Sequence, residues 1–435
     1  MKVLIHTLGC PKNENDSEHL TGLLEKEGHE IISDLDKADV VIVNTCGFIN
    51  DAKRESVNAV LSYGKAKKKN SLLVVTGCLS QRYPEELFSE IEEADIIIGV
   101  NDYLNLPRLL ETYKERILKV TETPSDFFDY ELRITEEGSV TSYLRLSEGC
   151  DNCCTYCAIP MIRGPYRSRR IEDILSEAKA LSEKGVKELI LIGQDVTNYG
   201  IDLYGKLVLP ELLKELNDIE GIKWIRLMYC YEDKITEALI EQIRDLEKVV
   251  KYIDIPLQHL SDNVLRKMNR KSTQKSIYHT VSMLRERVPG IRIRTTFITG
   301  FPGETERDFQ ILLEGIKDLE FDRLGVFAYS GEEGTPAYSM KGKVALEIRE
   351  LRRDKLMEAQ LEISLKKNLN MKGETLEVLV EDEEEKGVYL GRTRYDAPSI
   401  DNSVIFTSDE KLKKGDFVNV YIEDGFDYDL KGIKV

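Results

Sequence analysis

Three closely spaced cysteines near the middle of the chain constrain it more than any other feature. Cys150, Cys154 and Cys157 follow the pattern C-x3-C-x2-C. An iron-sulfur cubane normally binds four thiolates, one on each iron, so a loop that provides three leaves one iron open. An open iron can bind a substrate or a cofactor. The spacing therefore predicts a 4Fe-4S cluster with a vacant position at which chemistry can start.

Two other uses of these cysteines fit the sequence less well. A structural zinc site needs four ligands, usually as two separated pairs, and the chain has no second C-x2-C or H-x3-H pair. Disulfides are disfavoured because cysteines in a chain without an export signal usually stay reduced. Cys153 leaves an alternative open, since it allows other C-x2-C and C-x3-C pairings. We assign Cys150, Cys154 and Cys157 as the ligands.

Length and composition predict a globular chain of about three domains, which we place at residues 1–125, 140–345 and 370–435, with a linker helix at 346–369. The first residues do not resemble a signal peptide, and no apolar run approaches the roughly 20 residues of a membrane helix. We therefore expect a cytoplasmic protein without a membrane partner. A formal net charge of −17 disfavours nucleic acid as the direct substrate and favours a basic partner.

The N-terminal third repeats one unit three times. Short apolar runs at residues 3–5, 40–43 and 72–75 read as buried parallel strands, and Cys10, Cys46 and Cys78 follow them closely, each beside a glycine. Loops after the carboxyl ends of parallel strands gather at one edge of an α/β sheet, so these cysteines should converge. A fourth run at 95–100 has no cysteine. This domain therefore predicts a second cluster with an open iron.

The central region alternates apolar runs with helix-length amphipathic segments. The runs are residues 142–146, 188–192, 224–229, 252–255, 291–298 and 324–329. Six βα units predict a partial TIM-like barrel with its active site at the C-terminal strand ends, where the cysteine loop follows the first strand. Gln194, residues 258–259 and Gly300 lie at the same rim, so we expect contacts with a cofactor or substrate there. Cys230 ends a strand without a partner and reads as a core residue.

The C-terminal segment changes character twice. Residues 346–368 have helical periodicity, and after residue 371 four strand-like runs and a fifth near 432–433 predict a small OB-like β-barrel. Residues 371–435 hold 9 Lys and Arg against 16 Asp and Glu, a difference of −7, which makes a phosphate-binding surface less probable. Arg392 and Arg394 are expected to form its one local basic spot.

The cysteine loop resembles that of the radical S-adenosylmethionine superfamily, in which S-adenosylmethionine chelates the open iron and is cleaved to a 5'-deoxyadenosyl radical. With its three-cysteine α/β domain, radical SAM barrel and TRAM-like terminal barrel, the whole chain resembles the methylthiotransferases. Some members modify an adenosine of tRNA and others a ribosomal protein. Four segments are similar to the second group: LGCPKN at 8–13, PLQHLSD at 256–262, RTTFITGFPGET at 294–305 and GRTRYDAP at 391–398.

The resemblance implies a substrate, cofactors and partners. The substrate is an aspartate of small-subunit ribosomal protein S-twelve, which gains a methylthio group at its β-carbon. The cofactors are S-adenosylmethionine and two 4Fe-4S clusters: the barrel cluster cleaves S-adenosylmethionine, and the cluster on Cys10, Cys46 and Cys78 carries or delivers sulfur. Tyr156, Gln194 and Gly300 are the expected S-adenosylmethionine contacts. Electrons come from a low-potential flavodoxin or ferredoxin.

Two rival functions remain open on the sequence. A methylthiotransferase acting on tRNA adenosine has the same cofactors and fold, and a non-catalytic iron-sulfur carrier explains the cysteines but not the barrel. We also hypothesise that the acidic terminal domain docks the basic ribosomal protein or the small ribosomal subunit. Unchanged affinity after deletion of the residues beyond Asn370 would count against that docking role.

Overall fold

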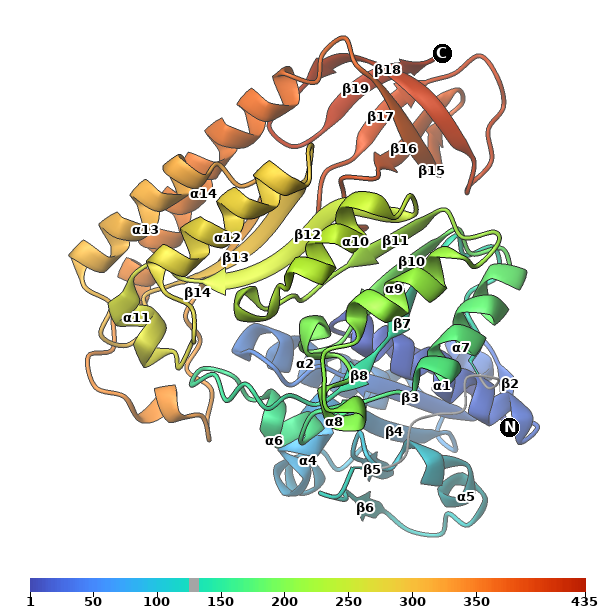
Figure 1. Ribbon diagram of the computed structural model, residues 1–435. Helices are drawn as coiled ribbons and strands as arrows, with labels where there is room; N and C mark the ends of the chain where they lie inside the picture. The colour runs from blue at the N-terminus through green and yellow to red at the C-terminus, as the bar shows by residue number, and fades with distance from the viewer. Residues whose placement is uncertain (125–132) are drawn as a thin grey trace.

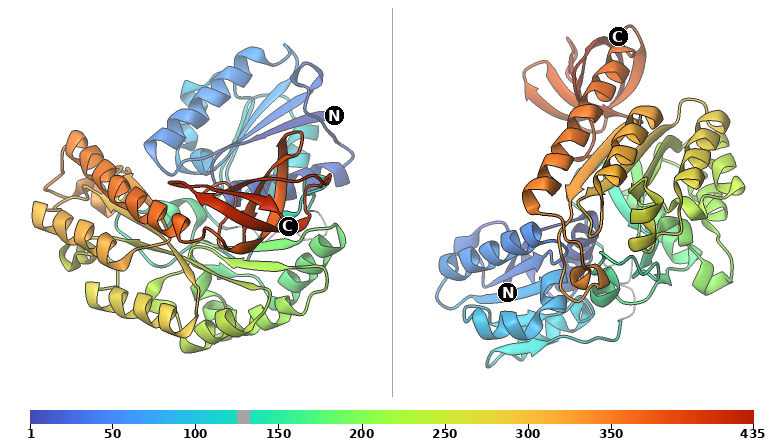
Figure 2. Two further views of the ribbon diagram at one scale, coloured as in Figure 1. Left: turned by 90° about the horizontal axis from the view of Figure 1, so that it is seen from above. Right: turned by 90° about the vertical axis from the view of Figure 1, so that its left-hand side faces the viewer.

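A computed structural model describes residues 1–124 and 133–435, which fold into three bodies (Figure 1). The N-terminal α/β domain lies at one end, the central barrel in the middle and the C-terminal β-barrel at the other end. The right-hand view of Figure 2 shows the same separation from the side. In the described part of the chain, no helix is long and apolar enough to cross a membrane.

The N-terminal domain is a six-stranded parallel sheet in the order β2-β1-β3-β4-β5-β6. Its strands are β1 (Lys2–Thr7), β2 (Glu30–Ile31), β3 (Val40–Thr45), β4 (Leu72–Gly77), β5 (Ile96–Ile98) and β6 (Ile117–Lys119). One face packs on α1 (Pro11–Lys26) and α5 (Leu106–Glu111), and the other on α2 (Asn50–Ala66), α3 (Cys78–Arg82) and α4 (Pro84–Glu90). Strand β3 is buried along its whole length, as expected for a central strand covered on both faces.

The central region is an open barrel of six parallel strands in the order β14-β13-β12-β11-β10-β7. They are β7 (Thr141–Arg145), β10 (Glu188–Ile192), β11 (Trp224–Leu227), β12 (Val249–Gln258), β13 (Arg292–Thr299) and β14 (Arg323–Ala328). The outer helices are α7 (Ile171–Glu183), α9 (Leu209–Asn217), α10 (Glu237–Asp245), α12 (Gln274–Arg287) and α13 (Glu306–Leu319). Each of the six expected runs forms one strand, so the predicted partial barrel is confirmed.

Short elements complete the mouth of the barrel, at the C-terminal strand ends. They are β8 (Ser147–Glu148), α6 (Ile159–Arg163), β9 (Arg167–Ser168), α8 (Ile201–Tyr204) and α11 (Asp262–Lys267). Strands β8 and β9 pair in antiparallel fashion, which closes the base of the loop that carries the cysteines. The N-terminal domain adjoins this end, where α3 packs against α6 and α1 against β7.

The C-terminal segment has the form expected from the sequence. Helix α14 (Leu346–Leu369) packs along β14 and α13. A closed five-stranded barrel follows, in the order β15-β16-β17-β19-β18. Its strands are β15 (Thr375–Glu385), β16 (Val388–Thr393), β17 (Val404–Thr407), β18 (Phe417–Gly425) and β19 (Leu430–Lys434).

The C-terminal barrel packs against the N-terminal strand ends of the central barrel, at the end opposite the cysteines. Arg392 forms ion pairs with Glu188 at the start of β10 and with Glu381 of its own domain. The ring of Trp224, at the start of β11, packs edge-on against Phe417 at a centroid distance of 4.9 Å. The prediction that Arg392 and Arg394 form a basic spot on the surface is therefore wrong. Arg392 is only 1% exposed, and its charge neutralises a buried carboxylate.

Candidate active site

The cysteines of the central loop, Cys150, Cys154 and Cys157, form a group that we call the barrel triplet. Cys150 and Cys154 are buried and Cys157 is half-buried, and the three thiols are close enough for their charges to interact. Cys153 is exposed, and its backbone has a φ of +50°. The structure therefore brings together the three cysteines that we assigned and leaves Cys153 exposed to solvent.

Polar groups surround the sulfur atoms of the barrel triplet. Asn152 Nδ2 donates to Cys150 Sγ at 3.5 Å, and the backbone N–H of Ile159 donates to Cys157 Sγ at 3.5 Å. Cys154 Sγ lies 3.5 Å from the hydroxyl of Tyr231 and 3.9 Å from Nη1 of Arg270. Hydrogen-bond donors and a nearby cation stabilise thiolates, so these contacts favour metal binding.

The N-terminal cysteines, Cys10, Cys46 and Cys78, converge as predicted and form the N-terminal triplet. Cys10 caps α1, Cys46 follows β3 and Cys78 begins α3. A Cβ atom added to Gly9 would lie 2.8 Å from Cβ of Cys46, which shows how closely the first two loops approach. The neighbouring thiols also act electrostatically on Cys78.

The glycines beside these cysteines differ in their roles. Gly9 and Gly77 both adopt φ values of +100°, a region that favours glycine. Gly47 does not, but a Cβ there would lie 2.7 Å from the Cα of Leu79. Two of the glycines therefore allow the turn from strand to helix, and the third allows close packing of the loops.

The two triplets adjoin each other. Cys78 packs against Ala158 and Ile162, which flank the start of α6 directly after the barrel triplet. From the same helix, Arg163 Nη2 donates to Cys78 Sγ at 3.3 Å and to Asn13 Oδ1 at 2.9 Å. The sequence pattern gave no signal for this contact, because it joins residues 85 positions apart in different domains.

The donor set fits iron-sulfur clusters better than a single metal ion. Burial raises the pKa of Cys78 and of Cys157 to about 12 in the metal-free protein, so bound iron and nearby cations are needed to hold the thiolates. Among residues 1–124 and 133–435, no three His, Cys, Asp or Glu side chains are arranged to hold one ion. The thiolates of a cubane bind separate irons and are therefore more widely spaced than the ligands of one ion.

A buried charge network connects the two triplets. Arg145 binds Glu148 Oε2 at 2.6 Å and Asp16 Oδ1 at 2.5 Å, and Arg163 Nη1 binds Asp16 Oδ2 at 2.8 Å. Burial alone would raise the pKa of Glu148, but Arg163 and Arg145 outweigh it and lower that pKa to about 2. Gln194 Nε2 donates to Glu148 Oε1 at 2.7 Å, whereas Gln194 Oε1 is buried without a hydrogen-bond partner among the described residues. That oxygen can accept a hydrogen bond from a ligand.

Other residues expected at the site have distinct surroundings. Tyr156 lies beside Cys154 and packs against the apolar cluster that contains Phe301. The N–H of Gly300 donates to Glu304 at 2.8 Å, and a Cβ there would meet Cγ of Arg349 at 2.1 Å. Arg349 of α14 therefore fills the space beside the Cα of Gly300. The assignment of Gly300 as an S-adenosylmethionine contact stays a prediction.

Two further rim residues are buried. Nδ1 of His259 accepts a hydrogen bond from the N–H of Ser261 at 2.9 Å, and its Nε2 lies 3.5 Å from Glu304 Oε2. This supports a structural role for His259 at the start of α11. Cys230 is fully buried in the core of the central barrel, as expected.

Sequence analysis missed Lys12, which also lies at this site. It belongs to the first turn of α1 and is only 8% exposed. Burial lowers the pKa of Lys12, while the charges of Cys10 and Glu148 raise it. The ammonium lies 4.0 Å from the centroid of the Tyr229 ring. Tyr229 has a φ of +58°, which is rare for a bulky residue and is typical of functional sites.

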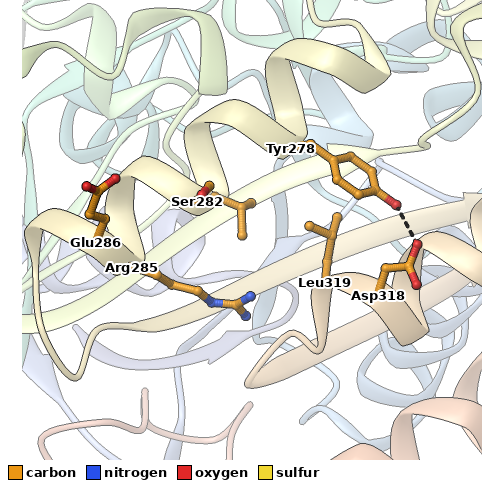
Figure 3. A pocket seen from close by; sticks show the side chains of 7 residues that line it. Tyr278, Ser282, Arg285, Glu286, Asp318 and Leu319 are labelled. Atoms are coloured by element: carbon orange, nitrogen blue, oxygen red, sulfur yellow. Dashed lines mark hydrogen bonds between the residues drawn. The ribbon is translucent and has the colours of Figure 1, made fainter.

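A separate groove of about 600 Å³ lies on the outer surface, between α12 and α13 (Figure 3). Its lining includes Arg285 and Leu319, and the Tyr278 hydroxyl donates to Asp318 Oδ2 at 3.3 Å. None of its lining residues is a cysteine. It belongs to the helical shell of the barrel, so the triplets remain the candidate active site.

Comparison with known proteins gives matches along the whole chain. The family model described as uncharacterized protein family UPF0004 matches residues 2–99, the radical SAM superfamily model residues 144–316 and the TRAM domain model residues 373–435. The ribosomal protein uS12 methylthiotransferase RimO of Acetivibrio thermocellus is 50% identical and covers 99% of this chain and 98% of its own. The RimO protein of Clostridioides difficile is 47% identical, with coverage of 99% and 98%.

Solved structures show a similar fold at low sequence identity. The radical S-adenosylmethionine methyltransferase TsrM from Kitasatospora setae aligns with a TM-score of 0.56 and 15% identity, over 78% of this chain and 77% of its own. The cobalamin-dependent enzyme OxsB aligns with a TM-score of 0.54 and 15% identity, over 84% of this chain and 56% of its own. These likenesses support the architecture of an α/β domain joined to a radical SAM barrel.

Proposed function

The chain belongs to the family of ribosomal protein uS12 methylthiotransferases, and we propose that it adds a methylthio group to the β-carbon of an aspartate of ribosomal protein uS12. It is a radical S-adenosylmethionine enzyme. The observation that carries this proposal is the contact of Cys78 with α6, the helix that directly follows the barrel triplet, because methylthio transfer needs a radical-generating centre and a sulfur source at one substrate carbon. The Cys78–Arg163 hydrogen bond and the packing of Cys78 on Ala158 support that arrangement.

The cofactors of this family are 4Fe-4S clusters and S-adenosylmethionine. In our proposal the barrel triplet binds one cluster and the N-terminal triplet binds the other. When bound, these groups supply the one-electron cleavage chemistry, the sulfur and the methyl group. In the same proposal Tyr156 and Oε1 of Gln194, which has no hydrogen-bond partner among the described residues, contact S-adenosylmethionine near the barrel triplet.

The chain itself positions and shields these groups. Tyr231 and Arg270 hold Cys154, and Arg163 holds Cys78. The charge network around Glu148 locks the N-terminal domain against the mouth of the barrel, and its ionised groups are buried. Excluding water strengthens electrostatic interactions inside a site and suppresses side reactions.

Mass spectrometry of ribosomal proteins and of tRNA from cells with and without this protein tests the proposal. We expect the mass of one methylthio group on uS12 only when the enzyme is present, with tRNA unchanged. The same mass on a tRNA adenosine, and none on uS12, would overturn the proposal. The acidic terminal domain, with its charge difference of −7, favours the basic ribosomal protein over a polyphosphate.

The partners follow from the same chemistry. A low-potential flavodoxin or ferredoxin would supply electrons, and the reaction would take place in the cytoplasm, where ribosomes assemble. We also propose that the exposed acidic end of β15, residues 382–385, contacts the basic substrate or the small ribosomal subunit. Because deletion of the terminal domain would uncover the buried Glu188, a cleaner test reverses the charges at this end of β15.

Such a test compares two variants for affinity to uS12. The first variant changes Glu383, Glu384 and Glu385 to Lys. The matched control changes the exposed residues Glu85, Glu86 and Glu90 to Lys. A docking role predicts weaker binding in the first variant alone and a weaker dependence on salt. Equal affinity in both variants would contradict it.

A further inference from the structure

Lys12 is a buried cation whose partner among the described residues is an aromatic ring rather than an anion. It is only 8% exposed. Within residues 1–124 and 133–435 its ammonium forms no hydrogen bond or ion pair, and it contacts the Tyr229 ring at 4.0 Å from the centroid. A charge removed from water is costly unless an opposite charge or hydrogen bonds compensate it. An aromatic ring compensates only part of that cost. The surroundings of Lys12 are therefore incomplete without an anion.

The carboxylate whose charge acts on Lys12 and the carboxylate that binds the Tyr229 backbone both have other partners. Glu148 is bound by Arg145, Arg163 and Gln194. Asp254, next to Tyr229, accepts the Tyr229 N–H at 3.0 Å and pairs with Arg294 at 2.9 Å. Because Glu148 is satisfied and the thiolate of Cys10 is assigned to iron in the N-terminal triplet, the anion that completes Lys12 comes from a ligand.

The position of Lys12 indicates which ligand. Lys12 follows Cys10 of the N-terminal triplet by two residues, and its ammonium lies over the ring of Tyr229, just beyond the C-terminal end of β11. It therefore lies where the N-terminal domain meets the mouth of the barrel, and its charge also acts on Cys157 of the barrel triplet. In the proposed reaction, the substrate carbon must reach both sites. In an aspartate that β-carbon is bonded directly to a carboxylate, whereas an adenosine has no carboxylate to offer.

We propose that Lys12 binds the side-chain carboxylate of the substrate aspartate and so holds the β-carbon between the two triplets. This inference rests on the proposed function and makes Lys12 a specificity-determining residue. Tyr229, fixed in its left-handed conformation by the Asp254 hydrogen bond, supports the ammonium from the barrel side. Lys12 comes from the N-terminal domain, so binding of the carboxylate also needs the two domains together.

The test measures binding in a four-way comparison. The anaerobically reconstituted enzyme and its Lys12→Met variant are titrated with uS12 and with uS12 in which the target aspartate is changed to Asn. We expect the wild-type enzyme to prefer the aspartate form by about tenfold to a hundredfold, as for a hydrogen bond to a charged group. Lys12→Met should bind both forms equally. This loss of coupling separates a direct contact from a general loss of stability.

Two further variants serve as controls. Lys12→Arg keeps the charge and should keep a preference for the aspartate form. Lys26→Met removes an exposed lysine at the far end of α1 and should behave as the wild type. Iron content and affinity for S-adenosylmethionine are measured for every variant, because the carboxylate of S-adenosylmethionine is the other candidate anion.

Each alternative outcome has a defined meaning. If the wild-type enzyme does not bind uS12, the proposed function fails and this inference fails with it. If the wild type binds uS12 but does not distinguish Asp from Asn, or if Lys12→Met keeps the preference, the inference alone is overturned. It is also overturned if Lys12→Met weakens only the binding of S-adenosylmethionine.

Discussion

Arg163 donates a hydrogen bond to the sulfur of Cys78 at 3.3 Å across the boundary between the central barrel and the N-terminal domain. Arg163 lies six residues after Cys157 in the chain, so one short segment carries both the barrel triplet and a donor to the other triplet. A change at either cysteine group can therefore be transmitted to the other through α6. The electronic properties of the N-terminal cluster should depend on a residue of the barrel.

Replacing Arg163 by Gln should lower the reduction potential of the N-terminal cluster. Hydrogen bonds to the sulfurs tune the potential of such clusters, and loss of a positive charge disfavours the reduced, more negative state. The measurement is an electron paramagnetic resonance redox titration in a background where Cys150, Cys154 and Cys157 are Ser, so that only one cluster is present. Arg170→Gln, at an exposed arginine on the same segment, is the control. An unchanged potential in Arg163→Gln would refute this coupling.

Cys153 should be dispensable for cluster binding. It is exposed, whereas Cys150 and Cys154 are buried beside each other. We expect Cys153→Ser to keep its full iron content after anaerobic reconstitution, and Cys154→Ser to lose about half, since three thiolates anchor each cluster. Iron and sulfide analysis checks both variants. Equal iron loss in the two variants would mean that Cys153 takes part in binding.

Much of the fold could be predicted from local patterns. The apolar runs at 40–43 and 188–192 became the buried strands β3 and β10, because a strand covered on both faces needs continuous hydrophobic residues. The convergence of Cys10, Cys46 and Cys78 followed from the rule that loops after parallel strands share one edge.

Contacts between domains could not be predicted in this way. Arg163 looks like an ordinary helix residue, and Lys12 like a solvent-exposed lysine in the first turn of α1. Their burial depends on how the N-terminal domain packs against the barrel, which no periodicity encodes. Arg392 was misread for the same reason: a basic residue in an acidic domain suggests a surface patch, but its partner Glu188 lies 204 positions earlier in the chain.

Replacing Arg392 by Ala should detach the C-terminal barrel from the central barrel. It would leave Glu188 buried with Arg226 as its remaining ion-pair partner, and breaking a buried ion pair typically costs about 3–5 kcal/mol. Trp224 is the one tryptophan of the chain and packs on Phe417 at this interface, so its fluorescence reports docking directly. We expect the fluorescence transition at a lower urea concentration.

The control for this variant is Arg394→Ala. Arg394 is partly exposed and donates to the backbone oxygen of Glu247 at 3.1 Å, so its removal should shift the transition much less. Equal shifts in the two variants would contradict a specific role for the Arg392–Glu188 pair.

Ionisation of Glu177 should make the free energy of unfolding depend on pH in the acidic range. This residue of α7 is buried between Arg133 and Arg169. Burial alone would raise its pKa, but Arg169 and Arg133 lower it from 4.5 to about 2. A folded-state pKa below the unfolded value contributes stability that is complete above about pH 4.5 and is lost as the pH falls toward 2.

The Glu177→Gln variant, which cannot ionise, should lack this contribution. In urea unfolding of the metal-free protein, it should be less stable than the wild type at pH 7 by about 3–5 kcal/mol, the usual cost of breaking a buried pair. The gap should narrow as the pH is lowered from 4.5, because the wild-type carboxylate then becomes protonated. Glu172→Gln, exposed on the same helix, should follow the wild-type curve. A gap that stays constant down to pH 3 would show that the charge of Glu177 is not what stabilises this contact.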